Sequence, residues 1–223
     1  GWITHPTVPT TNNSEDVYSF TTYDNGKTWY CSVVVENCTN VKCYGERGVF
    51  CGGRIQGGNN YSDVIEYIAI GTPATTATDF GNLAGARGWC GTCSDGSRGV
   101  NSGGWQPSLS DVIDYVTIAS TGNAIDFGDT THSWYAGFGF SSTVRGIAGG
   151  GQTPDSPNNM NNGIDVITIR TTGNATEFGD LTLNSGGRYA AGGSSNSTRG
   201  LIAGGRYNPN TYTNAIGFIT ISS

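Results

Sequence analysis

A seven-residue motif recurs four times along this 223-residue chain, at intervals of about fifty residues. Each copy begins with Arg-Gly, continues with small or apolar residues and ends with Gly-Gly. The copies are RGVFCGG (47–53), RGVNSGG (98–104), RGIAGGG (145–151) and RGLIAGG (199–205). Self-similarity at a period of about 20 to 50 residues is typical of solenoids, propellers and linear arrays. The chain is therefore predicted to be a repeat protein.

Two further patterns recur with the same period as this motif. After each copy comes a strand-like apolar run, and three of these runs are followed by an acidic-Phe-Gly triplet. The runs are YIAI (67–70), YVTI (115–118), VITI (166–169) and FITI (218–221). The triplets are DFG (79–81), DFG (126–128) and EFG (177–179). Three recurring elements at one period indicate a structural unit of several short segments.

Composition narrows the class of protein and its partners. Charged residues make up only 13% of the chain, while Thr, Ser and Asn are abundant, which favours a virion or extracellular location over the cytosol. The net charge is −6 without any basic run, so nucleic acid is not an expected partner. No stretch approaches the ~20 apolar residues of a membrane span, so no membrane insertion is expected. The chain begins with Gly1, and we expect a removed leader or a longer parent product.

All cysteines lie in the first part of the chain. An even number in a charge-poor, extracytoplasmic chain favours disulfides. The disulfide candidates are Cys31, Cys38, Cys43, Cys51, Cys90 and Cys93. A zinc site of Cys38, Cys43, Cys90 and Cys93 is an alternative, although its spacing matches no standard zinc knuckle. The C-x-x-C at 90–93 also has the form of a redox pair, but no helix is expected there to lower the thiol pKa.

Helices are not expected, because no segment of about 10 to 12 residues repeats its apolar side chains at helical spacing. Short β-branched and aromatic runs alternate with clusters of Gly, Asn, Ser and Pro, which is the pattern of strands and turns. In the third repeat a polar loop at 152–162 separates the second strand from the third. The strands expected in this repeat cover residues 133–141, 144–148, 164–170 and 175–178.

Four short antiparallel strands per repeat, arranged around a ring, make up a β-propeller. We therefore expect an all-β propeller of four blades, with five as the alternative. In this interpretation Gly lets the inner strands approach closely, and the Phe of each triplet fills the gap between neighbouring sheets. The repeated Arg and the repeated acid are expected to pair between strands or across blades. Residues 1–16 would form an N-terminal extension and 17–223 the propeller, with repeats near 17–46, 47–97, 98–144, 145–198 and 199–223.

The repeated pattern resembles the kelch motif. A hydrophobic strand ending in Gly-Gly is followed by an aromatic-containing strand, and Phe80, Phe127 and Phe178 stand where kelch repeats usually have Trp. The consensus RGhhxGG, then hhxYhTIxxTGNAxDFGDLT, also resembles kelch-like repeats in structural and tail-fibre proteins of marine tailed bacteriophages. The resemblance covers residues 47–223 and is closest at 121–129 and 172–182. It implies kelch-like blades and a virion protein.

The N-terminal part carries a different signature. Residues 22–29 (TYDNGKTW) resemble the Asp-box S-x-D-x-G-x-T-W, with Thr in place of Ser. That resemblance implies a structural hairpin turn of a propeller, and not a glycosidase. Residues 17–22 fall in register with the third strands of the repeats, and Trp29-Tyr30 takes the place of the triplets.

The expected strands exceed by one the number that four complete blades need. The strand at Trp29 would complete the sheet begun by residues 187–222, which leaves Val17–Thr22 or Ile216–Ile221 surplus. An unpaired strand edge can template pairing with another chain. We expect one terminal strand to dock on a neighbouring subunit or to continue into further polypeptide. A fifth blade built partly from residues 1–45 is the alternative.

The connections between second and third strands are the most variable parts of the repeats, and all should project from one face. They cover residues 54–62, 105–110, 152–162 and 206–214. Loops carry recognition more often than strands do. Their amides and aromatic rings suit sugars, although ordinary solvated turns are the alternative. The candidate ligand-binding residues are Tyr61, Trp105, Asn158, Asn159, Tyr207 and Tyr212.

These observations favour a non-enzymatic structural protein exposed on a virion or tail, which attaches to a host surface or glycan. Its expected partners are copies of itself, other virion or appendage proteins, and a cell-surface glycan. A self-assembling extracellular filament or surface-layer subunit is the alternative, and a propeller-scaffold glycosidase is disfavoured because the acids recur as scaffold residues do. A cytosolic kelch adaptor is disfavoured by the low charge. No catalytic residue, metal or cofactor is expected.

Overall fold

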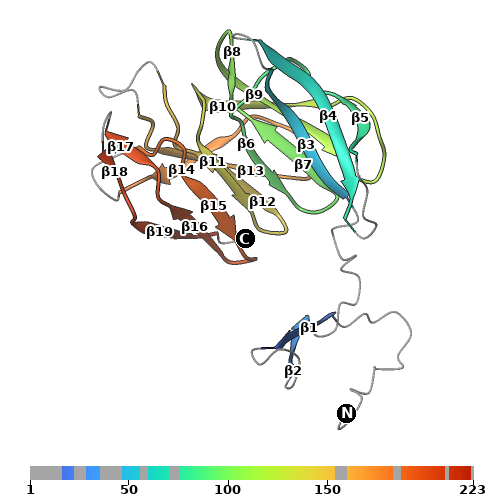
Figure 1. The fold of residues 1–223 in the computed structure, drawn as a ribbon. Coiled ribbons are helices and arrows are strands. Elements are labelled where there is room, and N and C mark those ends of the chain that lie inside the picture. Colours follow the sequence, from blue (N-terminus) through green and yellow to red (C-terminus); the bar gives the residue numbers. More distant parts are fainter. Residues whose placement is uncertain are drawn as a thin grey trace. The chain divides into compact units, whose positions relative to one another are not determined.

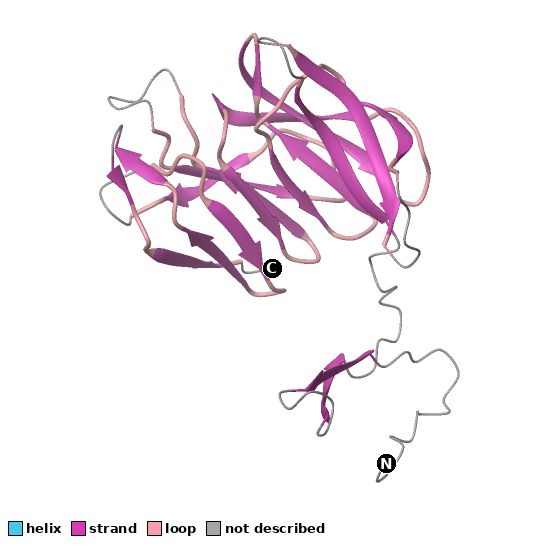
Figure 2. Cartoon of the chain, in the orientation of Figure 1, coloured by secondary structure: helices cyan, strands magenta, loops and turns pink. Residues whose placement is uncertain are grey.

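The computed structural model describes residues 17–22, 29–35, 47–55, 60–70, 76–153, 160–182, 187–208 and 211–221. For residues 17–22, 29–35 and 208 only the backbone is described. The chain divides into two compact units, Gly1–Tyr44 and Gly45–Ser223. Every regular element in the described ranges is a β-strand, so the all-β prediction is confirmed (Figure 2). Within these ranges no helix is long and apolar enough to cross a membrane.

The first unit contains one antiparallel hairpin, β1 (Val17–Thr22) with β2 (Trp29–Val35). The second unit contains four larger sheets that succeed one another along the chain (Figure 1). The first sheet consists of β3 (Arg47–Arg54), β4 (Tyr61–Ala69) and β5 (Thr78–Asn82). The second consists of β6 (Gly91–Ser94), β7 (Arg98–Ser102), β9 (Ser108–Thr117) and β10 (Ile125–Trp134), with β8 (Trp105–Gln106) paired to β9.

The third sheet consists of β11 (Phe138–Ser141), β12 (Arg145–Gly149), β13 (Gly163–Thr168) and β14 (Thr176–Asp180). The fourth consists of β15 (Gly192–Ser195), β16 (Arg199–Ala203) and β19 (Ile216–Thr220). A small hairpin, β17 (Arg206–Asn208) with β18 (Thr211–Tyr212), lies between β16 and β19 in the sequence.

Consecutive strands pair antiparallel in the second and third sheets, as the four-stranded repeat predicts. In the third repeat the last three strands lie close to their predicted bounds. The prediction of a first strand at 133–141 was wrong at its start, because Trp134 still belongs to β10 and pairs with Ser110. A turn at Ala136, whose φ is 54°, then separates β10 from β11.

The first strands of the last three sheets lie side by side and are joined through serines. Ser141 donates its N–H to Ser195 Oγ (3.2 Å), and its own Oγ donates to the carbonyl of Ser94 (2.6 Å). A Cβ on Gly139 would overlap the backbone of Thr92 in the neighbouring first strand. Only Gly permits so close an approach, so the predicted use of Gly between inner strands is confirmed at this position.

Each acidic-Phe-Gly triplet forms a one-residue bulge in the outermost strand of its sheet. In the second sheet Asp126 pairs with Asp114, and Gly128 pairs with Ile113, which leaves Phe127 without a partner in the ladder. The same irregularity occurs in the first and third sheets. A bulge redirects the extra side chain, and here the redirected side chain is the Phe.

The redirected Phe fills the gap between one sheet and the next. Phe127 is buried in a cluster with Ile169 of the third sheet, and Phe80 is buried in a cluster with Val116 of the second. Phe178 packs against the cluster that joins the third and fourth sheets. The predicted role of the triplet Phe is therefore confirmed at all of these junctions.

A Thr-Gly-Asn-Ala loop closes over the first two junctions. We call residues 121–124 and 172–175 the clasp loops. Gly173 donates its N–H to the carbonyl of Phe127 (2.7 Å), and Ala175 donates to the carbonyl of Asp129 (2.8 Å). The equivalent bonds of the other loop run from Gly122 to Phe80 (2.7 Å) and from Ala124 to Asn82 (2.8 Å). The repeated loop therefore ties the outermost strand of one sheet to the next sheet.

The repeated Arg has a different partner from the one predicted. Arg47 Nη1 donates to the carbonyl of Ile118 (2.9 Å), and Arg98 Nη1 donates to the carbonyl of Ile169 (3.0 Å). Each guanidinium also lies over a Tyr ring of its own sheet, Tyr67 or Tyr115. The predicted pairing with the triplet acid was wrong, because those acids stand exposed on the outermost strands.

A closed ring is not seen. Among the described residues, no strand pairs with β19 on the side away from β16, so the fourth sheet has three strands. The expected closing strand, β2, pairs with β1 in the first unit. That pairing joins Val17 to Val35 and Tyr18 to Val33, which leaves residue 34 without a partner in the ladder. The equivalence of Trp29-Tyr30 to the triplets stays a prediction. The grouping of residues 17–46 with the propeller stays a prediction, and the Asp-box turn at 23–28 lies outside the described residues.

Candidate functional site: an aromatic cluster at the second-to-third connections

The second-to-third connections begin at equivalent places in successive sheets. In the last three repeats the residue after Gly-Gly forms an isolated antiparallel bridge with a residue that precedes a first strand. These bridges join Gly88 to Trp105, Tyr135 to Gln152, and Tyr189 to Arg206. The backbone thereby brings three connections to corresponding edges of their sheets, as the prediction of one shared loop face requires.

Aromatic side chains from these edges meet across the sheets. The centroid of the Tyr135 ring lies 5.6 Å from that of Trp89, 5.2 Å from that of Trp105 and 5.7 Å from that of Tyr189. Tyr61 continues the row, 5.7 Å from Trp89. Rings at such separations, tilted or edge-to-face, attract one another beyond their burial. We call these five residues the aromatic cluster.

Polar groups lie directly beside the rings. The hydroxyl of Tyr135 donates to Gln152 Oε1 at 2.6 Å, and the guanidinium of Arg206 lies over the Tyr189 ring at 4.6 Å. Burial, reinforced by the neighbouring Tyr189, raises the pKa of Tyr135, so its hydroxyl stays protonated and can donate. The cluster thus combines aromatic rings with an amide at the hydroxyl of Tyr135 and a guanidinium over the face of Tyr189.

Sequence reasoning missed three members of this cluster. Trp89, Tyr135 and Tyr189 lie just before the first strands of their sheets. The sequence predicted no binding residue at these positions, and Tyr135 was expected inside the strand at 133–141. Trp89 has a φ of 57° and remains 44% exposed. A bulky residue in the left-handed region is uncommon and often marks a functional position. The available signal was the recurrence of Tyr at positions 135 and 189, at the same place in successive repeats.

The structure brings together only some of the predicted ligand residues. Tyr61 and Trp105 belong to the aromatic cluster. Tyr207 is half-buried and Tyr212 is exposed in the β17–β18 hairpin, and among the described residues no ring contact links either to the cluster. Asn158 and Asn159 lie outside the described residues.

The cysteines do not behave as the disulfide prediction expected. Cys51, Cys90 and Cys93 are free thiols, so the structure does not support pairing among them. Burial raises the pKa of Cys51 and of Cys93 to about 12, and it raises that of Cys90 as well. A redox C-x-x-C needs the opposite shift.

The remaining cysteine predictions fall on other parts of the chain. Cys31 lies in β2, where only the backbone is described, while Cys38 and Cys43 lie outside the described residues. Within the described ranges no group of three or more His, Cys, Asp or Glu side chains could hold a metal ion. The pairing of Cys31, Cys38 and Cys43 stays a prediction.

One buried ion pair joins the first and second sheets. Arg87 Nη2 lies 2.9 Å from Asp114 Oδ1, and both side chains are almost completely buried. The other oxygen of Asp114 accepts the N–H of Ala84 at 3.1 Å. These contacts hold the two neighbouring sheets together, so we assign the ion pair a structural role.

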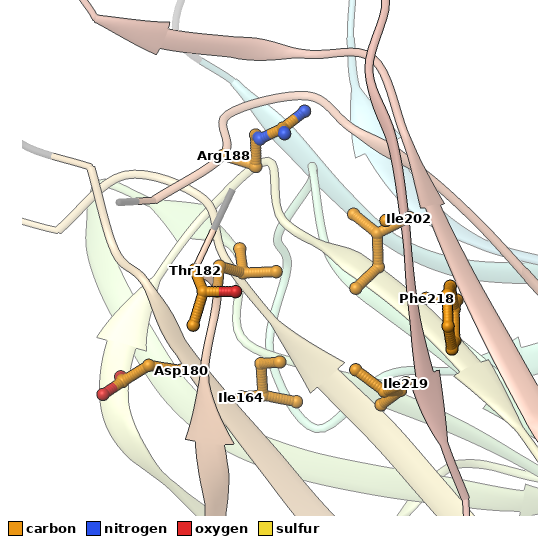
Figure 3. Close-up of a pocket in the computed structure, with 9 residues that line it drawn as sticks. Ile164, Asp180, Thr182, Arg188, Ile202, Phe218 and Ile219 are labelled. Atoms are coloured by element: carbon orange, nitrogen blue, oxygen red, sulfur yellow. The ribbon is translucent and has the colours of Figure 1, made fainter. Parts of the chain in front are cut away.

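A separate cavity of about 70 Å³ lies between β14 and β19 (Figure 3). The side chains of Ile164, Ile202 and Ile219 face it, with Phe218 at one side, while the carboxylate of Asp180 points away. Thr182 and Arg188 also line the cavity, so its wall is of mixed polarity.

Comparison with known proteins identifies no family for this chain. No family model matches the chain, and no curated protein sequence matches it.

Proposed function

We propose that this protein is a non-enzymatic structural protein of a virion, exposed on the particle or its tail, and that it attaches to a glycan on the host surface. The observation that carries the proposal is the aromatic cluster. It brings together rings from the edges of four successive sheets beside the amide of Gln152 and the guanidinium of Arg206. Sugars stack their C–H faces on such rings and bind amides through their hydroxyls.

The proposed scaffold is a propeller-type array of kelch-like blades, each sheet of the second unit being one blade. Support comes from the repeated antiparallel order and from the Phe that fills each junction. A rigid scaffold carrying recognition on loops at one face is a common division of labour. The virion assignment rests on the resemblance of the repeats and on the low charge of the chain.

A glycan array probed with the full chain tests the attachment role. We expect binding to a restricted set of glycans, weakened about two- to tenfold by Trp105→Ala or Trp89→Ala, because a lost stacking ring is worth roughly 0.5 to 1.5 kcal/mol. Ile125→Ala is the matched control, since Ile125 is also exposed and lies outside the cluster. Absence of binding to every glycan, or equal loss in the control, would refute the proposal.

The alternative, a self-assembling extracellular filament or surface-layer subunit, is favoured by a different observation. The fourth sheet has an unpaired edge at β19 among the described residues, and apolar side chains are exposed around it. Exposed apolar patches on an ordered sheet mark interaction sites. Sedimentation of the purified chain distinguishes this function, because a filament subunit assembles without any glycan.

A further inference from the structure

Every junction in the array joins two unlike faces. The leading face of a sheet carries the third residue of the Arg-Gly motif and the Ile that starts the apolar part of the third strand. Where a following sheet exists, Val49 is partly buried and the others are buried, as at Val100, Ile147, Ile65, Ile113 and Ile164. In the fourth sheet their equivalents are Leu201 and Ile216, and Ile216 is 66% exposed. Phe218 beside them is 62% exposed.

The trailing face shows the same contrast at the other end. It carries the fourth residue of the motif and the Ile that ends the third strand's apolar run. Where a preceding sheet exists, Ile118 is partly buried and the others are buried, as at Asn101, Ala148, Ile202, Ile169 and Ile221. In the first sheet their equivalents are Phe50 and Ile70, which are 57% and 61% exposed. The array therefore ends in one uncovered leading face and one uncovered trailing face.

Polar groups at the two ends are complementary as well. Arg199 lies over the ring of Phe218, as Arg98 lies over Tyr115, yet among the described residues no carbonyl of a following sheet accepts from it. At the first two junctions the accepting carbonyl belongs to Ile118 or Ile169, the equivalents of Ile70, whereas at the third no such bond from Arg145 is found in the described residues. At the trailing end the carbonyl of Ile70 likewise accepts from no guanidinium in the described part of the chain.

The acid positions agree with this assignment. Asp114 and Asp165 on trailing faces accept N–H groups from Ala84 and Thr131 of the preceding sheets. Glu66 holds the equivalent position in the first sheet and is exposed. Among the described residues, the leading end thus presents the guanidinium of Arg199 without a carbonyl acceptor, and the trailing end presents the exposed carboxylate of Glu66.

We propose that the two ends bind each other between copies of the chain, so that the leading face of one fourth sheet docks on the trailing face of the next copy's first sheet. The occupant is a second copy because the missing half of each junction is the face at the opposite end of the same array. Within one chain the two faces do not meet, since Phe50, Ile70, Ile216 and Phe218 are all more than half exposed. Contacts between unlike faces are heterologous and generate rings or filaments.

The cavity of Figure 3 belongs to the adjacent internal junction, because Ile164 and Asp180 of the third sheet line it together with Ile219 of the fourth. The inference rests on the blade arrangement proposed above and identifies the surface by which copies associate. It does not depend on glycan binding.

Sedimentation velocity of the full chain over a wide concentration range tests the proposal, with Phe50→Lys and Phe218→Glu as the main variants. The wild type is expected to assemble as concentration rises, and each variant is expected to associate at least about tenfold more weakly. An equimolar mixture of the two variants should associate more strongly than either variant alone, because each variant retains the face that the other has lost. Ile125→Lys, at an exposed Ile away from both ends, should assemble like wild type.

Three outcomes would overturn the proposal. A wild type that stays monomeric at every concentration would mean that the chain covers its own ends, for example with its N-terminal segment. Assembly that survives Phe50→Lys but not Phe218→Glu would mean pairing of like faces. Equal loss with Ile125→Lys would mean non-specific association. Thermal unfolding of each variant checks its fold, and the glycan array, read separately, tells failure of this inference from failure of the attachment role.

Discussion

Gly128 and Gly179 provide a matched pair that measures what a clasp loop contributes. Both are the Gly of an acidic-Phe-Gly triplet, and their φ angles are 144° and 148°. A Cβ on Gly128 would lie 2.5 Å from the backbone of Gly173, whereas a Cβ on Gly179 would meet nothing within 4 Å. Replacing each Gly by Ala therefore imposes the same backbone strain, but only one replacement also displaces a clasp loop.

The expected magnitudes follow from these two terms. A residue other than Gly at such a φ costs about 1 to 3 kcal/mol, and this cost applies to both variants. Forcing a methyl group into packed backbone costs about 1 to 3 kcal/mol more, and this applies to Gly128→Ala alone. We expect losses of roughly 2 to 6 kcal/mol for Gly128→Ala and roughly 1 to 3 kcal/mol for Gly179→Ala.

Urea unfolding, followed by tryptophan fluorescence, measures both losses by linear extrapolation. Gly81→Ala repeats the experiment at another junction, because a Cβ there would overlap the backbone of Gly122, and it should match Gly128→Ala. If all three variants lose the same stability within about 0.5 kcal/mol, which is the scatter expected between independent sites, the clasp loops contribute nothing measurable and the reasoning fails.

Three further predictions concern buried charges and thiols. Asp114→Ala should destabilise the fold by about 3 to 5 kcal/mol, because it leaves Arg87 as a buried uncompensated charge; a loss below about 1 kcal/mol on urea unfolding would contradict this. Cys93, whose pKa burial raises to about 12, should stay protonated and resist alkylation at pH 8 until the protein unfolds, as mass spectrometry can follow, and rapid labelling of the native protein would count against it. Burial alone would raise the pKa of Asp95, but hydrogen bonds from the backbone N–H of Arg98 and from neighbouring groups hold it below its ordinary value. Its carboxylate therefore stabilises the fold above the ordinary pKa and ceases to do so as pH falls through the lowered one; Asp95→Asn should be less stable than wild type at neutral pH and equal to it in strong acid, and a gap independent of pH would argue otherwise.

The candidate site was only partly predictable. Tyr61 and Trp105 could be selected because they lie in variable connections between strands, which the repeat pattern locates. Tyr135, at the centre of the cluster, follows directly on a strand and carries no local sign of exposure. Its role depends on rings brought from positions 61, 89 and 189, and such contacts are set by how sheets stack.

The sequence by itself determined the period of the repeat, the absence of helical spacing, most third-repeat strands and the gap-filling role of the triplet Phe. These follow from local chemistry, since strand pairing has a side-chain period of two and Gly marks turns and close approaches. It could not determine that Arg47 would bond a carbonyl of the next sheet, because that partner lies 71 residues away.

Only the tertiary structure decided which equivalent positions are covered. Gly128 and Gly179 share sequence context and backbone conformation, yet one is closed over by a clasp loop and the other stands open. Ile164 and Ile216 likewise hold one place in the repeat, yet the first is buried and the second exposed. A repeat encodes both halves of every junction, but burial depends on the neighbour that the array supplies, and at its ends the described chain supplies none.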